Sequence, residues 1–367
     1  GVQGKAPSPY WDPMAWMIQQ CHRRGMEFHA WINPYRARMK SPTRLADNHI
    51  LKTHPERAFE YGGLYVLNPG LKENRDYILS VVDDIVSRYD IDGIHIDDYF
   101  YPYPEGGRPI PDDREYALYN NGIADRGDWR RYNVNLFVKE MGEHVHKLKP
   151  WVKFGVSPFG IYRNKKSSPI GSDTNGLQNY DQLYADVLLW VNNGWIDYCV
   201  PQLYWHIGHP LADYEKLIKW WAKHMANRPL YIGESIENTV QNSDPANPNT
   251  HQMAAKFSLH RQLRNVSGTV LWYAKVAAED IGSYGTMLRN VYWKSKALPP
   301  YMPFLDSKAP KKPAKVGDAW TEDGLMLYWS APKAKKWGDE ARRYVIYRFA
   351  KGEKVNLTGA SKIVKIT

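Results

Sequence analysis

Short apolar segments alternate with amphipathic segments from residue 11 to residue 294, and this alternation constrains the fold more than any other feature. The apolar segments predict strands at residues 27–33, 92–97, 152–156, 197–204, 229–234 and 268–273. Helical spacing predicts helices at residues 11–24, 74–89, 130–148, 182–193, 214–226, 250–264 and 284–294. Strict alternation with nearly continuous apolar strands is typical of a parallel sheet covered by helices. The sequence therefore predicts an α/β fold.

The longer loops follow strands and the shorter ones follow helices. This asymmetry is typical of a (β/α)8 TIM-type barrel, whose working face lies at the carboxyl ends of its strands. A closed barrel has eight strands and eight helices, whereas the pattern gives six strands and seven helices. We therefore expect strand one, helix one and strand two to be missing from this chain. A doubly wound open sheet is the alternative, but the Gly-rich phosphate turn typical of that fold is not found.

The character of the sequence changes after residue 298. Proline, lysine and alanine dominate residues 299–315, which predicts a stiff linker. Residues 316–367 show strand-like segments at 324–329 and 343–348 without helical periodicity. The spacing of Leu327, Trp329 and Pro332, followed by the sequence YVIYR, resembles a fibronectin type III sandwich. We therefore predict a barrel at residues 1–298, a linker, and a β-sandwich that is incomplete at its carboxyl end.

Composition limits the class of protein. A hydrophobic fraction of 43% with 24% charged residues is enough for a large core. No segment approaches the ~18 apolar residues that a membrane helix requires. The formal net charge of +10 indicates anionic surroundings. Lysine and arginine are scattered rather than clustered before the tail, so we expect no nucleic-acid partner.

Polar and aromatic residues stand where the predicted strands end. Asp97 shares its orientation with His95 and should point into the barrel mouth, while Asp98 begins the following loop. The other candidates at strand ends or in the loops after them are Asn33, Tyr35, Arg36, Tyr99, Ser157, Asp173, Asn175, Gln202, Tyr204, Trp205, Glu234 and Trp272. Carboxylates serve as acid, base or nucleophile in glycosidic cleavage, and aromatic rings stack on sugars. The set therefore favours a glycosidase acting on an oligosaccharide or polysaccharide.

Several of these residues also have structural interpretations. Asp98 can cap a turn, Glu234 can form a loop salt bridge, and Asp173 can hold an Asx turn. We expect His95 to be a polar residue that is hydrogen-bonded within the barrel rather than a metal ligand, because His-x-Asp alone is a weak metal signal. We expect no metal and no cofactor.

Five segments in order resemble the glycosyl hydrolase-like 10 family. They are EFHAWINPYR at 27–36, DGIHIDDYFYP at 92–102, GVSPFGI at 155–161, GSDTNGLQNYD at 171–181 and WIDYCVPQLYW at 195–205. The resemblance implies a (β/α)8 barrel and an extracytoplasmic location, with any lipid anchor lying outside this chain. It also implies cleavage of an envelope glycan, with peptidoglycan glycan strands as the favoured substrate.

The resemblance also implies roles for the acids. It places the nucleophile or base at the end of the fourth barrel strand, which is Asp97 here. The partner acid often comes from the fifth or sixth strand, but those ends carry Ser157 and Gln202, so the general acid stays open among Asp98, Asp173 and Glu234. The alternatives are a catalytically inactive glycan-binding envelope protein and a metal-dependent polysaccharide deacetylase.

Overall fold

A six-stranded parallel sheet forms the centre of the protein, whose computed structural model describes residues 5–41, 43–225, 227–334 and 340–367. Its strands are, in spatial order, β1 (His29–Ile32), β5 (Gly93–Ile96), β6 (Lys153–Val156), β7 (Tyr198–Cys199), β8 (Leu230–Ser235) and β11 (Val266–Trp272). Each of the six predicted strands is present, and spatial order follows sequence order. The α/β fold and the parallel sheet are thus confirmed.

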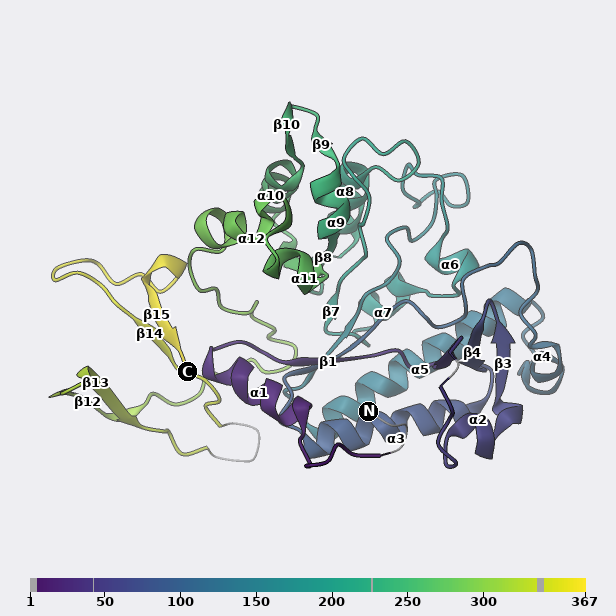
Figure 1. The fold of residues 1–367 in the computed structure, drawn as a ribbon, viewed down its shortest axis with the longest axis horizontal. Helices are drawn as coiled ribbons and strands as arrows, with labels where there is room; N and C mark the ends of the chain where they lie inside the picture. The colour runs from purple at the N-terminus through teal and green to yellow at the C-terminus, as the bar shows by residue number, and fades with distance from the viewer. Residues whose placement is uncertain (1–4, 42, 226, 335–339) are drawn as a thin grey trace.

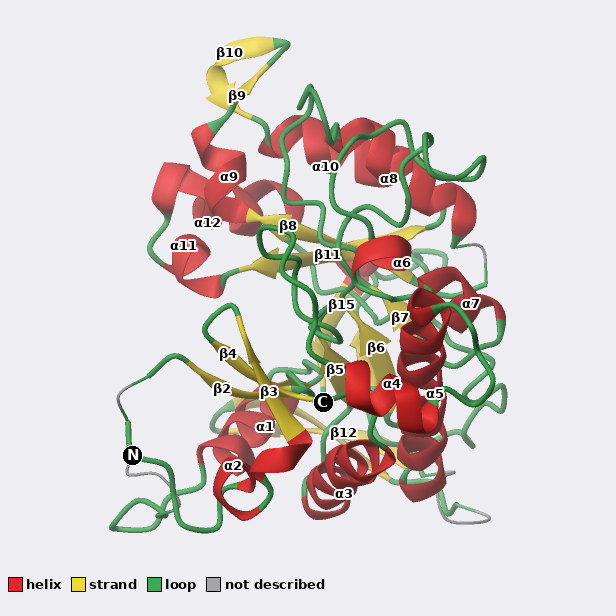
Figure 2. Ribbon diagram, turned by 90° about the vertical axis from the view of Figure 1, so that its right-hand side faces the viewer, coloured by secondary structure: helices red, strands yellow, loops and turns green. Residues whose placement is uncertain are grey.

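The sheet is curled into a half-barrel, as Figure 2 shows. Among the described residues no strand pairing joins β1 to β11, although the rings of Trp31 and Trp272 on these edge strands lie 5.5 Å apart in an edge-to-face arrangement. A curled parallel sheet of this kind is consistent with a TIM-like fold. The two further barrel strands stay a prediction.

Helices cover the outer side of the sheet. The main ones are α1 (Pro13–Arg23), α3 (Lys72–Arg88), α5 (Arg126–Leu148), α7 (Val187–Asn192), α8 (Tyr214–His224) and α10 (Met253–Gln262). Ile78 and Val82 of α3 are buried as its apolar spacing predicts, whereas Val81 is exposed. The predicted helix at 284–294 is broken into α12 (Tyr284–Met287) and a π-helical turn, η3 (Leu288–Tyr292).

Residues 34–70, predicted as a long loop, contain a small antiparallel sheet. Its strands are β2 (Arg36–Met39), β3 (Ala58–Tyr61) and β4 (Leu64–Leu67), with α2 (Ile50–Thr53) and η1 (Pro55–Arg57) between β2 and β3. Gly62 and Gly63 join β3 to β4 with φ of 59° and 76°. Two positive-φ residues form the turn that matches the twist of a two-residue hairpin, so Gly62-Gly63 was the sequence signal for this sheet.

Short elements fill the other loops. They are α4 (Asp113–Tyr119), α6 (Asn179–Gln182), α9 (Ile236–Gln241), β9 (Ser243–Asp244), β10 (Asn247–His251), α11 (Ala274–Ala278) and η2 (Ile281–Ser283). Strand β10 takes the first two residues of the helix predicted at 250–264, and α7 covers only half of the helix predicted at 182–193. No helix in the described part of the chain combines the length and apolar character needed to cross a membrane.

The carboxyl-terminal part contains two separate strand pairs, which Figure 1 shows on the same side of the molecule as α1. They are β12 (Ala314–Thr321) with β13 (Gly324–Ser330), and β14 (Val345–Tyr347) with β15 (Ile363–Ile366), the latter preceded by η4 (Ala360–Lys362). Most side chains of the first pair are exposed. A fibronectin type III sandwich therefore stays a prediction.

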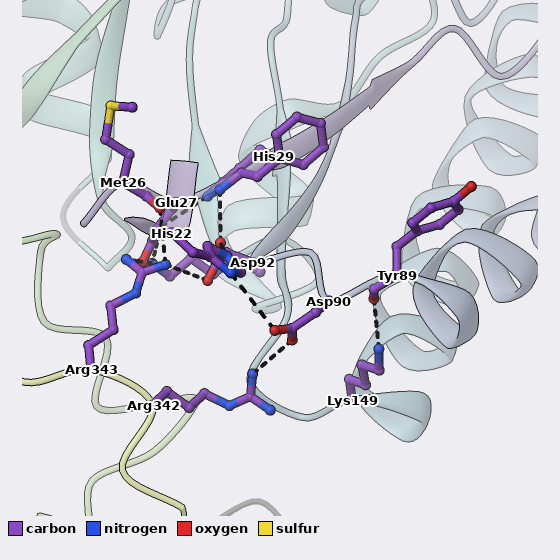
Figure 3. Close-up of polar contacts among 12 residues, drawn as sticks. His22, Met26, Glu27, His29, Tyr89, Asp90, Asp92, Lys149, Arg342 and Arg343 are labelled. Carbon is purple, nitrogen blue, oxygen red and sulfur yellow. Dashed lines mark hydrogen bonds and ion pairs between the residues drawn. The ribbon is translucent and has the colours of Figure 1, made fainter. Parts of the chain in front are cut away.

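Figure 3 shows how the end of the chain contacts the amino-terminal ends of the central strands. The guanidinium of Arg343 lies 2.7 Å from Asp92 Oδ1 and 3.7 Å from Glu27 Oε1. Arg342 lies 3.3 Å from Asp90 Oδ1. Asp92 directly precedes β5, so these ion pairs hold the carboxyl-terminal segment at the sheet end opposite Asp97.

Candidate active site

A cavity of about 700 Å³ fills the interior of the curled sheet. Its lining residues are Glu27, His29, Trp31, Asn33, Arg36, His95, Asp97, Tyr99, Lys153, Ser157, Tyr198, Val200, Gln202, Tyr204, Tyr231, Gly233, Val270, Leu271, Trp272 and Met302. Most come from alternate positions of the central strands, because every second side chain of a strand points to the same face. We call the end near Asp97 the mouth and the end near Glu27 the floor.

Asp97 is the carboxyl group at the mouth. It follows β5, and Gln202 Nε2 donates a hydrogen bond of 2.8 Å to its Oδ1 atom. Burial raises the pKa of Asp97 to about 7, and the negative charge of Asp98 adds to the rise, whereas Arg36 opposes it. A carboxyl group with this pKa exchanges a proton readily near neutral pH, as a general acid or base must.

Asp98 lies next to Asp97 but does not line the cavity. Its side chain is buried, with the residue only 1% exposed, and it accepts a hydrogen bond from the hydroxyl of Tyr103. Burial raises the pKa of Asp98 to about 6. Asp98 is thus placed to influence Asp97 electrostatically rather than to contact a ligand.

Glu234 was a candidate acid, but the structure places it in the layer between the sheet and the helices. Lys256 Nζ lies 2.9 Å from Glu234 Oε2, and Tyr214 donates a hydrogen bond to Oε1. Burial alone would raise the pKa of Glu234, but Lys256 and His260 outweigh it and hold that pKa below its ordinary value. An ionised, ion-paired carboxylate that faces away from the cavity is unsuited to be the general acid.

Asp173 and Asn175 also lie outside the cavity lining. The side chain of Asp173 is 72% exposed and lies 2.6 Å from Lys216 Nζ, whose hydrogen bond lowers the pKa of Asp173. Asn175 is exposed in the same loop. The loop after β6 therefore places both residues on the surface, and Asp173 is a poor candidate for the general acid.

Eight of the predicted substrate-binding residues do line the cavity, namely Asn33, Arg36, His95, Tyr99, Ser157, Gln202, Tyr204 and Trp272. Asn33 Oδ1 is buried without a hydrogen-bond partner among the described residues, so it can accept a bond from a ligand hydroxyl. Trp272 is 46% exposed and presents a ring at the mouth.

Two predicted aromatic residues pack elsewhere. Tyr35 is fully buried, and its ring contacts Phe137 of α5 at a centroid distance of 5.1 Å. Trp205 packs edge-to-face on Phe159 and is absent from the cavity lining. Both follow a strand closely, but a position after a strand end does not by itself decide which way a side chain points.

The prediction missed the polar floor of the cavity. Lys153 Nζ lies 2.6 Å and 2.7 Å from the two carboxylate oxygens of Glu27, and His29 Nε2 lies 3.0 Å from Glu27 Oε2. Burial raises the pKa of Glu27, but its bonds to His29 and Lys153 outweigh burial and lower that pKa to about 2. Strand alternation was the available signal, since Glu27, His29, Trp31 and Asn33 occupy every second position.

Tyr198 connects this floor to His95. Its hydroxyl lies 2.7 Å from His29 Nδ1 and 3.1 Å from His95 Nδ1. A Cβ atom added at Gly155 would lie 2.0 Å from the Tyr198 ring, so the absence of a side chain there admits the ring. Burial lowers the pKa of His95 to about 3, and His29 contributes to this shift, so the imidazole is neutral at physiological pH.

No group of three or more His, Cys, Asp or Glu residues in the described ranges is arranged to hold a metal ion. The site offers acid–base chemistry through its own side chains. It combines one carboxyl group of nearly neutral pKa at the mouth with amide groups and exposed aromatic rings. This combination suits proton transfer on a hydroxyl-rich, partly apolar ligand such as a sugar.

Comparison with known proteins gives clear sequence relatives. A model of the glycosyl hydrolase-like 10 family matches residues 2–249. Glycosyl hydrolase YngK of Bacillus subtilis (strain 168) is 40% identical over 361 residues, covering 96% of this chain and 70% of the relative. Glycosyl hydrolase DigH of Escherichia coli (strain K12) is 36% identical over 282 residues, covering 72% of this chain and 64% of the relative.

Similarity to solved structures is weaker. The glycoside hydrolase domain of PgaB (BpsB) from Bordetella bronchiseptica is 11% identical, with a TM-score of 0.45 over 74% of this chain and 77% of that chain. Alpha-L-fucosidase isoenzyme 2 from Paenibacillus thiaminolyticus is 11% identical, with a TM-score of 0.42 over 70% of this chain and 35% of that chain. These TM-scores are too low to support an argument about fold or function.

Proposed function

Because the chain belongs to the glycosyl hydrolase-like 10 family, we propose that it hydrolyses glycosidic bonds in a polysaccharide, with Asp97 as the central catalytic group. The observation that carries this proposal is the position of Asp97 at the mouth of an aromatic-lined cavity, with its pKa raised to about 7. Asp98 supports the same role, because its negative charge helps to raise the pKa of Asp97.

The direction of the pH dependence distinguishes two roles for Asp97. As a nucleophile or base it must be ionised, so activity would fall as the pH drops below about 7. As a general acid it must carry a proton, so activity would fall as the pH rises above about 7. We favour the nucleophile or base, because Arg36 and the hydrogen bond from Gln202 both favour the ionised form of Asp97.

We further propose an anionic envelope glycan as the substrate, with peptidoglycan glycan strands favoured, and an extracytoplasmic location. The net charge of +10 supports an anionic polymer. The names of the two relatives, both glycosyl hydrolases, support the class of reaction only.

The test is to incubate the purified protein with glycan strands and to measure new reducing ends. Wild type should release them, and Asp97→Asn should lose at least about a hundredfold in kcat while still binding the glycan. Asp173→Asn is the matched control, because its carboxylate is exposed and paired with Lys216 away from the cavity. Cleavage by Asp97→Asn at the wild-type rate would refute the assignment.

A catalytically inactive glycan-binding protein is the second candidate. It is favoured by one observation: apart from Glu27, which is paired with Lys153 on the floor, Asp97 is the sole carboxyl group in the described cavity lining. Glycosidases commonly use two carboxyl groups. Tight glycan binding by wild type and by Asp97→Asn, with no reducing ends from either, would establish the binding protein instead.

A further inference from the structure

Arg36 is a cation of the cavity that forms no direct ion pair with any described residue. It begins β2 and lines the mouth, and within the described residues its guanidinium group forms no ion pair at or below 4.0 Å. Lys153, the other cationic chain of the lining, is neutralised by Glu27 at 2.6 Å. The floor of the cavity is thus internally paired, whereas Arg36 at the mouth acts on Asp97 without forming a direct ion pair with it.

The surroundings of Arg36 fix where this charge acts. Its guanidinium carbon lies 5.1 Å from the centroid of the Tyr99 ring, which also lines the mouth. The positive charge of Arg36 also interacts with Asp97, and this interaction opposes the rise in the pKa of Asp97. Arg36 therefore lies in the same compartment as the carboxyl group that we assign to catalysis.

The chemistry of arginine indicates which class of ligand Arg36 can bind at the mouth. The guanidinium is planar and permanently charged, and its paired N–H groups match the two oxygens of a carboxylate. A partly enclosed charge without a partner costs free energy, which a ligand of opposite charge offsets on binding. A neutral sugar offers hydroxyl groups that Asn33 and Gln202 can bind, but it leaves Arg36 unpaired.

We propose that Arg36 binds a carboxylate carried by a sugar unit next to the scissile bond, so that the site selects an acidic glycan over a neutral one. This inference rests on the proposed glycosidase function. The charge balance of the whole chain, 49 basic against 39 acidic residues, agrees with an anionic polymer.

A different role for Arg36 would be purely internal. Its charge would then favour the ionised form of Asp97, and its side chain would support Tyr99. This role predicts equal losses for acidic and neutral substrates when Arg36 is replaced. Recognition of a carboxylate predicts a loss that depends on the substrate.

The experiment compares two versions of one oligosaccharide, one bearing carboxylates and the other with those groups reduced to primary alcohols. Wild type, Arg36→Gln, Arg36→Lys and Arg44→Gln are assayed for kcat/KM on both. Arg44→Gln removes the same charge from a surface side chain that is 86% exposed. Circular dichroism of each variant reports whether it has folded.

The expected result is a fall of about tenfold or more in the ratio of kcat/KM, acidic over reduced glycan, for Arg36→Gln. Arg36→Lys should lose less, because it keeps the charge without the planar fork. Arg44→Gln should keep the wild-type ratio. Equal losses on both glycans for Arg36→Gln would overturn the proposal in favour of the internal role.

The two proposals fail separately. If wild type cleaves neither glycan, the proposed hydrolase function fails, and calorimetric Kd values for the same two oligosaccharides then decide the role of Arg36. A preference for the acidic form that disappears in Arg36→Gln would support recognition of the carboxylate. Equal Kd values for the two forms in wild type would overturn it.

Discussion

Replacing Asp97 by asparagine should stabilise the protein at neutral and alkaline pH, even as it removes activity. The carboxyl group has a pKa near 3.8 when exposed, and burial with Asp98 nearby raises it to about 7 in the fold. Between these values the native state binds a proton that the unfolded state has released. The stability of wild type therefore falls as the pH rises through this window, whereas the asparagine side chain of the variant does not titrate.

The size of the effect follows from the shift. About three pKa units at 1.36 kcal/mol each give an upper limit of about 4 kcal/mol. Between pH 5 and pH 8 the single-site expression gives a smaller change, and screening by solvent at the mouth reduces it further, so we expect about 2 kcal/mol. The asparagine carbonyl can still accept the hydrogen bond that Gln202 donates to Asp97, so the comparison isolates the charge.

Calorimetric thermal midpoints of wild type and Asp97→Asn, measured at several pH values from 5 to 8, test this reasoning. The midpoint of the variant should exceed that of wild type by an amount that grows with pH to roughly 3 °C. Asp173→Asn is the control and should show no such gain, because hydrogen bonding to Lys216 lowers rather than raises the pKa of Asp173. Parallel pH profiles for wild type and Asp97→Asn would refute the idea that Asp97 carries a raised pKa.

Three further changes test other parts of the structure. Glu234→Gln should lower the free energy of unfolding by about 3 kcal/mol, because it leaves Lys256 buried without a counter-charge. The thermal midpoint should fall while the folded fraction keeps its kcat. A large loss of kcat would mean that Glu234 belongs to the active site. Trp272→Ala should weaken glycan binding about tenfold in titrations of intrinsic fluorescence, because it removes a ring from the mouth; unchanged Kd would exclude stacking there. Arg343→Ala should speed proteolysis within residues 340–367. It should leave kcat unaltered, because its ion pair with Asp92 lies at the end of the sheet opposite Asp97. An unchanged rate of proteolysis would show that this ion pair does not hold the segment.

The sheet was predictable because each central strand is a short apolar run, and burial on both faces of a parallel sheet demands such runs. The Ile94 and Ile96 side chains of β5 are fully buried, as that pattern requires. The β2-β4-β3 sheet was missed because β2 and β3 carry mixed polar and apolar residues, including Arg36 and Glu60, and because the apolar run of β4 is only four residues long. The Gly62-Gly63 turn could have been recognised from the sequence, but it was interpreted as part of a loop.

The positions of the candidate site residues were predictable where strand alternation was applied, and Glu234 was misplaced because alternation was not applied to its strand. Alternation places Asp97 in the mouth, as the structure finds. Applied to β8, the same rule puts Tyr231 and Gly233 toward the cavity and Glu234 toward the helices. The sequence cannot reveal that Lys256 of α10 neutralises Glu234, because that pair depends on how a distant helix packs on the sheet.

The ion pair between Arg343 and Asp92 has a consequence for the order of folding. It joins residues 251 positions apart, whereas neighbouring strands of the central sheet lie much closer together along the chain. Closing so long a loop costs more chain entropy than pairing successive strands. We therefore expect the carboxyl-terminal segment to dock last, onto a sheet end that β1 and β5 have already formed. Attachment of this segment would then occur only in molecules whose central sheet is complete.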